Sequence, residues 1–162
     1  MKKKLTHFDH KGAAHMVDIS KKQSTERTAI AKCKVYMLPS TLNLVEDGKL
    51  LKGDVIGVAR IAGIMAAKKT SDIIPLCHPL SLSQVSIDFL LISEPSHIEM
   101  KATVKTWGKT GVEMEALTAV SVAALTIYDM LKSVDKNIKI VDTHLIFKDG
   151  GKSGQHLSKE ML

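Results

Sequence analysis

Residues 84–107 read QVSIDFLLISEPSHIEMKATVKTW, and this run decides the fold class of the chain. Apolar and polar side chains alternate in both halves of the run, with apolar residues at Val85, Ile87, Phe89 and Leu91 and then at Ile98, Met100, Ala102 and Val104. A period of two indicates strands with one buried face. Because Glu94-Pro95-Ser96 between the halves is typical of a turn, the run predicts an antiparallel hairpin.

The segment before the hairpin predicts a strand and two helices. Residues 31–37 also alternate with period two, and Ser40 is expected to cap a short helix that ends near Gly48. Asp54 is expected to cap a second helix that runs to about Lys69 and is rich in glycine and alanine. Since a glycine inside a helix costs about 1 kcal/mol relative to alanine, we expect this helix to pack tightly against another backbone, with a subunit contact as one possibility.

The remaining elements complete a recognisable order. Residues 70–80 contain two prolines and are expected to be irregular. A helix is expected from about Val112 to Val134, and a last strand over residues 138–147. The order strand, helix, helix, strand, strand, helix, strand matches the ferredoxin-like pattern, an α+β fold with helices packed on one face of an antiparallel sheet.

The composition suits a single domain. The chain has 162 residues, of which 44% are hydrophobic and 25% charged, enough for one core. We expect one domain over residues 1–162, with mobile ends at about 1–15 and 150–162. Aromatic residues make up only 4%, which disfavours the stacking of single-stranded nucleic acid on aromatic platforms.

Charge and cysteine content indicate the partners and the compartment. The formal net charge of +6 favours phosphate-bearing ligands. The sequence shows neither a secretion signal nor a segment that approaches a membrane span, so a cytoplasmic protein without a membrane partner is expected. Cys33 and Cys77 are then expected to be reduced, Cys33 as a small buried hydrophobe. Cys77 lies beside His78, where a nucleophile–base pair is the alternative to a structural thiol.

Two ionisable residues stand in settings that suit chemistry. Lys52 directly precedes a predicted helix start, where the positive end of the helix dipole can lower a lysine pKa and favour proton transfer. His78 is the only polar side chain in the loop 73–80, whose two prolines would hold it rigidly. The plain alternatives are a surface lysine and a satisfied structural histidine.

Charged residues mark both ends of the long helix. Glu113 and Glu115 follow a glycine-bracketed Lys-Thr pair that resembles a phosphate loop in composition but lacks the P-loop spacing, and carboxylates suit a helix N-terminus for dipole reasons alone. Asp129 and Lys132 share one face, as an acid–base pair or a plain salt bridge. Glu115 and Asp129 are about 21 Å apart along one helix. A site that uses both ends is therefore elongated or built from two subunits.

The C-terminal segment adds two further cations. Lys148 and Lys152 stand among flexible glycines in residues 147–154. Such a segment can fold over a polyphosphate, or it can be a disordered basic tail.

Taken in order, five short runs resemble the molybdenum cofactor biosynthesis protein C family, the cyclic pyranopterin monophosphate synthases. These runs are LKGD (51–54), LCHPL (76–80), KTGVEMEALTA (109–119), IYDM (127–130) and GGKSG (150–154). The resemblance implies a lyase that converts 3′,8-cyclised dihydro-GTP to cyclic pyranopterin monophosphate and pyrophosphate. It also implies a ferredoxin-like fold, and a homohexamer of three dimers with sites at subunit boundaries.

The resemblance also implies roles for single residues. Catalytic roles fall on Lys52, Asp129 and Lys132. Substrate-binding roles fall on Leu76, Cys77, His78, Glu113, Met114 and Glu115, and on Arg27, Lys148 and Lys152. These residue types suit the reaction, since its rearrangement moves several protons and its triphosphate needs cations.

Two other classes make different predictions from the sequence. A basic nucleic-acid-binding domain would carry base-stacking aromatic residues within a basic motif. The strands offer Phe89 and Trp107, but no such motif surrounds either residue. A nucleotide phosphatase or transferase would show clustered acids for metal ions, and no tight cluster is present in the sequence. We expect no nucleic acid partner, no metal site and no required cofactor; the sequence does not indicate whether Mg²⁺ assists the triphosphate.

Overall fold

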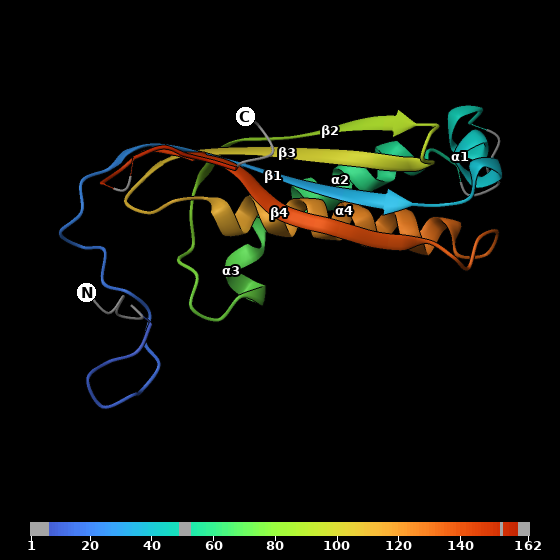
Figure 1. The fold of residues 1–162 in the computed structure, drawn as a ribbon. Coiled ribbons are helices and arrows are strands. Elements are labelled where there is room, and N and C mark those ends of the chain that lie inside the picture. The colour runs from blue at the N-terminus through green and yellow to red at the C-terminus, as the bar shows by residue number, and fades with distance from the viewer. Residues whose placement is uncertain (1–6, 49–52, 153, 159–162) are drawn as a thin grey trace.

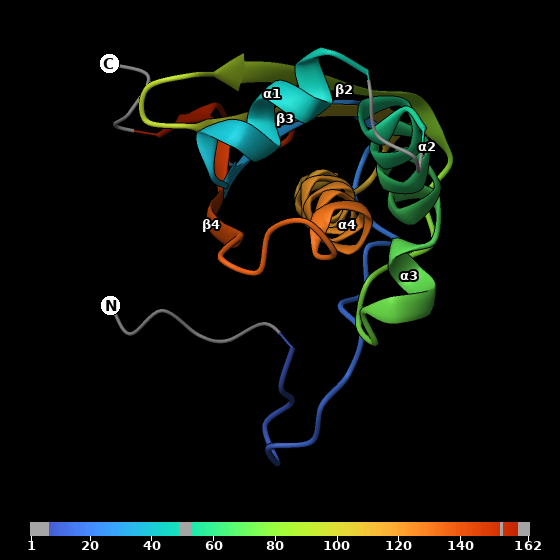
Figure 2. The ribbon, with the colours of Figure 1, turned by 90° about the vertical axis from the view of Figure 1, so that its right-hand side faces the viewer.

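The computed structural model describes residues 7–48, 53–152 and 154–158. In these residues an antiparallel sheet of order β2-β3-β1-β4-β5 carries helices on one face (Figures 1 and 2). The elements are β1 (Thr25–Tyr36), α1 (Pro39–Glu46), α2 (Val55–Lys68), α3 (Thr70–Ile73), β2 (Leu82–Ile92), β3 (His97–Gly108), α4 (Glu113–Leu131), β4 (Lys139–Asp149) and β5 (His156–Leu157). This α+β arrangement confirms the predicted ferredoxin-like fold.

The hairpin of β2 and β3 forms as its alternation predicts. Ile92 pairs with His97 next to the turn, and the antiparallel register continues to Leu82 and Thr106 with one irregularity. The inward-facing side chains of β3 are completely buried: Ile98, Met100, Ala102 and Val104. The buried face of the sheet therefore rests on α2 and α4, as period-two patterning requires.

The start of α1 differs from the prediction. Ser40 lies inside the helix and does not cap it, because Pro39 occupies the first helical position. The capping acceptor is Asp135, which follows α4 in the chain. Its Oδ2 accepts hydrogen bonds from the Leu38 backbone N–H at 2.8 Å and from the Thr41 hydroxyl at 3.2 Å. The cap comes from a distant residue, so no local pattern could have indicated it.

The glycine-rich helix α2 confirms the expected close packing. Asp54 caps the helix by accepting a hydrogen bond from the Gly57 N–H at 2.8 Å. A Cβ at Gly63 would lie 2.7 Å from the carbonyl oxygen of Ala119 and 3.3 Å from the Cβ of Ala123. The close approach is therefore made to α4 of the same subunit, and it accounts for a glycine inside the helix.

One other boundary is corrected, and a short strand is added. Residues 70–73 form α3 where an irregular segment was expected, because the Thr70 hydroxyl donates to the carbonyls of Ala66 and Ala67 and keeps the chain helical. Beyond β4, residues 156–157 form β5 and pair with Phe147 and Lys148.

By length and composition alone α4 could span a membrane, because the helix has 19 residues and an 18-residue window of it has a mean hydropathy of 1.4. The sequence expectation that no segment approaches a membrane span is wrong on that measure. Eight of its residues are buried, and it packs on the sheet beside α2 (Figure 2). It is the buried core helix of the domain.

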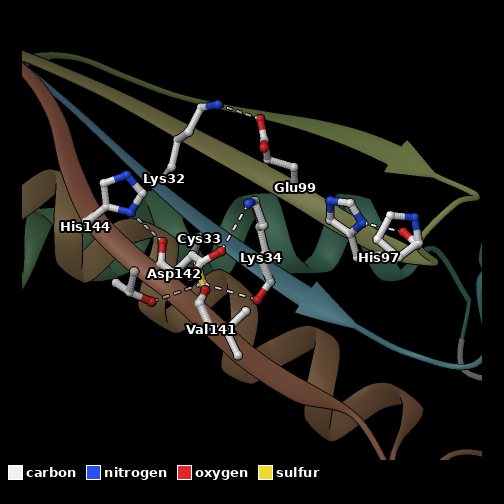
Figure 3. A network of polar contacts seen from close by, with 10 residues as sticks. Lys32, Cys33, Lys34, His97, Glu99, Val141, Asp142 and His144 are labelled. Atoms are coloured by element: carbon white, nitrogen blue, oxygen red, sulfur yellow. Dashed lines mark hydrogen bonds and ion pairs between the residues drawn. The ribbon is translucent and has the colours of Figure 1, made fainter. Parts of the chain in front are cut away.

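The other face of the sheet carries ion pairs (Figure 3). The Lys32 ammonium lies 2.8 Å from the Glu99 carboxylate, and the Lys34 ammonium lies 3.0 Å from that of Asp142. Between these lysines, Cys33 points into the core, and burial raises the pKa of its thiol. Cys33 is therefore a buried, unreactive hydrophobe, as predicted.

Candidate functional site

A cationic cavity lies at one end of the sheet, where β1 starts, β4 ends and α4 starts (left in Figure 1). Its volume is about 830 Å³, within the range of small-molecule sites. Its cationic lining consists of Lys21, Lys22, Arg27, Lys109, Lys148 and Lys152, and its acidic lining of Glu113 and Asp149. The excess of cations suits an anionic ligand of several charges.

Arg27 is held at the cavity by its backbone surroundings. Its Nε donates to the carbonyl oxygen of Gly108 at 3.3 Å. Gly150 and Gly151 turn over it with φ of +106° and +73°, a conformation that favours glycine. A Cβ at Gly151 would overlap the guanidinium of Arg27, so this glycine lets the side chain lie against the backbone.

Lys148 and Glu113 form an ion pair inside the cavity. The Nζ of Lys148 lies 2.9 Å from Oε1 of Glu113, and each side chain is about one third exposed. Glu113 begins α4, where a negative group interacts favourably with the helix dipole. An incoming phosphate would therefore compete with Glu113 for both Lys148 and the helix N-terminus.

Glu115 is turned away from solvent, with 4% of its surface exposed. Burial raises the pKa of its carboxyl group, and the charge of Glu113 acts in the same direction. Burial also raises the pKa of the Cys77 thiol, with a further contribution from Glu115. Cys77 thus lacks the depressed pKa of an activated nucleophile, and the structural-thiol alternative is the better one.

His78 contacts the N-terminal segment. Its Nε2 lies 2.8 Å from the carbonyl oxygen of Val17, so this nitrogen carries a proton and donates it. The neighbouring Leu76 is half-buried, and Met114 is 38% exposed. Thus, of the predicted substrate-binding residues, the cavity brings together Arg27, Glu113, Lys148 and Lys152, and its lining does not include Leu76, Cys77, His78, Met114 or Glu115.

The predicted catalytic pair lies at the opposite end of α4. The Nζ of Lys132 lies 2.6 Å from Oδ1 of Asp129, and both side chains are more than half exposed. The hydrogen bond to Asp129, with its charge, raises the pKa of Lys132. Lys52 lies outside the described residues. Because Glu115 and Asp129 both belong to α4, the separation of about 21 Å along the helix axis holds within one subunit.

The model of the MoaC family matches residues 16–151 of the chain. The chain belongs to the MoaC family. The cyclic pyranopterin monophosphate synthase of Dinoroseobacter shibae is 60% identical over 93% of this chain and 96% of its own length. The enzymes of the same name from Heliobacterium modesticaldum and Clostridium perfringens are 60% and 58% identical over 96% of this chain and 98% of their own lengths.

The part of the chain that matches the MoaC model contains every predicted site residue except Lys152, which follows it directly. Sequence reasoning did not assign Lys21, Lys22 or Lys109 to the site, although Lys109 belongs to the Lys-Thr pair that resembles a phosphate loop in composition. The first two stand in a polar segment without periodicity, and only the folded position of that segment shows where they lie. Within the described residues, no group of three or more His, Cys, Asp or Glu side chains is arranged to hold a metal ion.

Proposed function

We propose that this chain is a cyclic pyranopterin monophosphate synthase, a lyase of molybdenum cofactor biosynthesis. Its substrate is 3′,8-cyclo-7,8-dihydroguanosine 5′-triphosphate, and its products are cyclic pyranopterin monophosphate and pyrophosphate. Near-full-length similarity to synthases of this name carries the proposal. The cationic cavity supports it, since a triphosphate and a leaving pyrophosphate both need preorganised positive charge.

The cavity residues bind the phosphates. Arg27, fixed beneath the glycine turn, presents a planar group that suits two phosphate oxygens. Lys148 is released to the substrate when a phosphate displaces Glu113. Lys152 closes over the same anion from the tail.

Lys52 and Lys132 carry out the proton transfers, and Asp129 orients them or accepts a proton. One subunit cannot offer Asp129 and Lys132 to a ligand in its own cavity, because α4 separates the two ends. The complete site therefore combines the start of α4 from one subunit with the end of α4 from a neighbour. We propose a homohexamer built as a trimer of dimers. Exposed apolar side chains on the helical face support a subunit contact: Val58, Ile61, Met65 and Leu125.

The remaining partners follow from this reaction. The proposed reaction requires no cofactor. It works in the cytoplasm on a small molecule, without a nucleic acid or membrane partner.

Product analysis after incubation with the cyclised GTP tests the proposal directly. Asp129→Ala, Lys132→Ala and Lys52→Ala should each lower single-turnover conversion about 10²–10⁴-fold. Circular dichroism and light scattering should show an unchanged fold and hexamer. Lys136→Ala is the matched control, because Lys136 is an exposed lysine just after α4. Near wild-type turnover in the Lys132 and Lys52 variants would exclude their catalytic role, and a wild-type chain that forms no product would exclude the function.

A further inference from the structure

The segment that precedes β1 makes a tight turn beside the cavity. The Ser20 N–H donates to Oδ1 of Asp18 at 2.8 Å, and the Lys22 N–H donates to the Ile19 carbonyl at 3.0 Å. Lys21 and Lys22 stand on this turn with exposed side chains that line the cavity. Residues 18–22, called the lysine turn below, thus bring two cations to the phosphate site from outside the sheet.

Lys109 fastens the lysine turn to the loop between β3 and α4. Its Nζ donates to the carbonyl oxygen of Ser20 at 2.7 Å, across 89 positions of sequence. The Ser20 N–H and hydroxyl hold the pKa of Asp18 below its ordinary value, and the charge of Lys109 acts in the same direction. One ammonium group therefore bonds a carbonyl of the turn, and its charge also acts on the Asp18 carboxylate. His78 holds the chain just before the turn, through its contact with the Val17 carbonyl.

We propose that Lys109 is a positioning residue, which holds the lysine turn so that Lys21 and Lys22 bind the phosphate chain of the substrate. The identity of that ligand rests on the proposed function. A turn of polar residues on an otherwise exposed segment loses conformational entropy when it is fixed in place. The hydrogen bond from Lys109 fixes the turn before the ligand binds. Lys21 and Lys22 therefore bind as preorganised cations and lose little conformational entropy on binding.

The alternative role for Lys109 is direct phosphate binding, since it also lines the cavity. The two roles differ in additivity. A direct ligand contributes whether or not Lys21 and Lys22 are present. A positioning residue has nothing left to position once both lysines are removed, so its effect disappears in that background.

The experiment measures the affinity of the full-length protein for inorganic pyrophosphate by titration calorimetry. Lys109→Met and the Lys21→Ala/Lys22→Ala pair should each weaken binding about tenfold, and the triple variant should bind no more weakly than the pair. Hydrogen exchange in residues 16–24 should become faster in Lys109→Met, and Lys109→Arg, which keeps a donor and a charge, should restore both readouts. Lys101→Met, an exposed lysine on β3, is the control for loss of charge.

Each outcome decides the proposal. Additive losses would make Lys109 a direct phosphate ligand and overturn the positioning role. Unchanged affinity and unchanged exchange in Lys109→Met would also overturn it, while conversion of the cyclised GTP by the same protein would leave the proposed function standing. A wild-type protein that binds no pyrophosphate and forms no product would refute the proposed function itself.

Discussion

Asp135 offers a sharp test of the fold that carries the site. Its carboxylate is 2% exposed and accepts three hydrogen bonds, from Leu38 N–H, the Thr41 hydroxyl and Asn137 N–H, at 2.8, 3.2 and 2.8 Å. It joins the start of α1 to the chain just after α4. In Asp135→Ala, three bonds to a charged acceptor are lost, and the Leu38 and Asn137 backbone donors, whose bonds are part-buried, lose their partner. We expect a loss of about 3–5 kcal/mol in the free energy of unfolding.

The assay is urea unfolding, followed by circular dichroism at one fixed protein concentration because the proposed oligomer would unfold in a concentration-dependent way. Asp135→Asn keeps one acceptor and should lose less, and Thr41→Val should lose about 1 kcal/mol. Burial opposes ionisation of Asp135, but its hydrogen bonds prevail and lower its pKa. Its contribution is therefore present above the ordinary carboxyl pKa and is lost as pH falls through the lowered one. A loss below about 1 kcal/mol in Asp135→Ala would refute the capping role.

Three further substitutions test the cavity and its surroundings. Burial raises the pKa of Glu115, so the wild-type protein loses stability as pH rises above the ordinary value of 4.5. The melting temperature of Glu115→Gln should therefore increase relative to that of the wild type over the same pH rise. A difference in melting temperature that does not change with pH would contradict this prediction. Gly151→Ala should displace the Arg27 guanidinium, cost about 1–2 kcal/mol of stability and weaken pyrophosphate binding in calorimetry; unchanged binding would show that Arg27 is not a ligand. Glu113→Gln should free Lys148 and tighten pyrophosphate binding by up to about fivefold, as expected for a partly exposed ion pair; weaker binding would mean that Glu113 supports the anion.

The parts of the fold that sequence predicted correctly depend on neighbours in the chain. The hairpin follows from alternation in β2 and β3, and the cap of α2 follows from Asp54 three positions before Gly57. The cap of α1 could not be predicted, because Asp135 lies 97 positions from Leu38. Ser40 fits the local rule for a capping residue. In the structure the helix begins at Pro39 instead, and a distant carboxylate accepts the hydrogen bond at its start.

The site residues also fall into two groups, those that the sequence indicated and those that only tertiary contacts place in the cavity. The family resemblance implied Glu113, Lys148 and Arg27, of which Glu113 alone lies in a quoted motif, and the structure places all three in one cavity. Lys21 and Lys22 belong to no motif, since their position depends on a bond between segments 89 positions apart. A sequence can show that cations are present, but only tertiary contacts decide which of them face the ligand.

Helix α4 also fixes how the two ends of the proposed site are oriented. From Glu113 to Leu131 it is one uninterrupted helix, anchored by Gly63 of α2 near its middle. One alanine inserted between Ala124 and Asp129 would advance the later residues by about 1.5 Å and rotate them by about 100° around the axis. Every functional side chain would remain, yet the Asp129–Lys132 face would point to a different neighbour. In the proposed assembly, the number of residues in α4 therefore sets both the distance between the two ends of the site and their relative orientation.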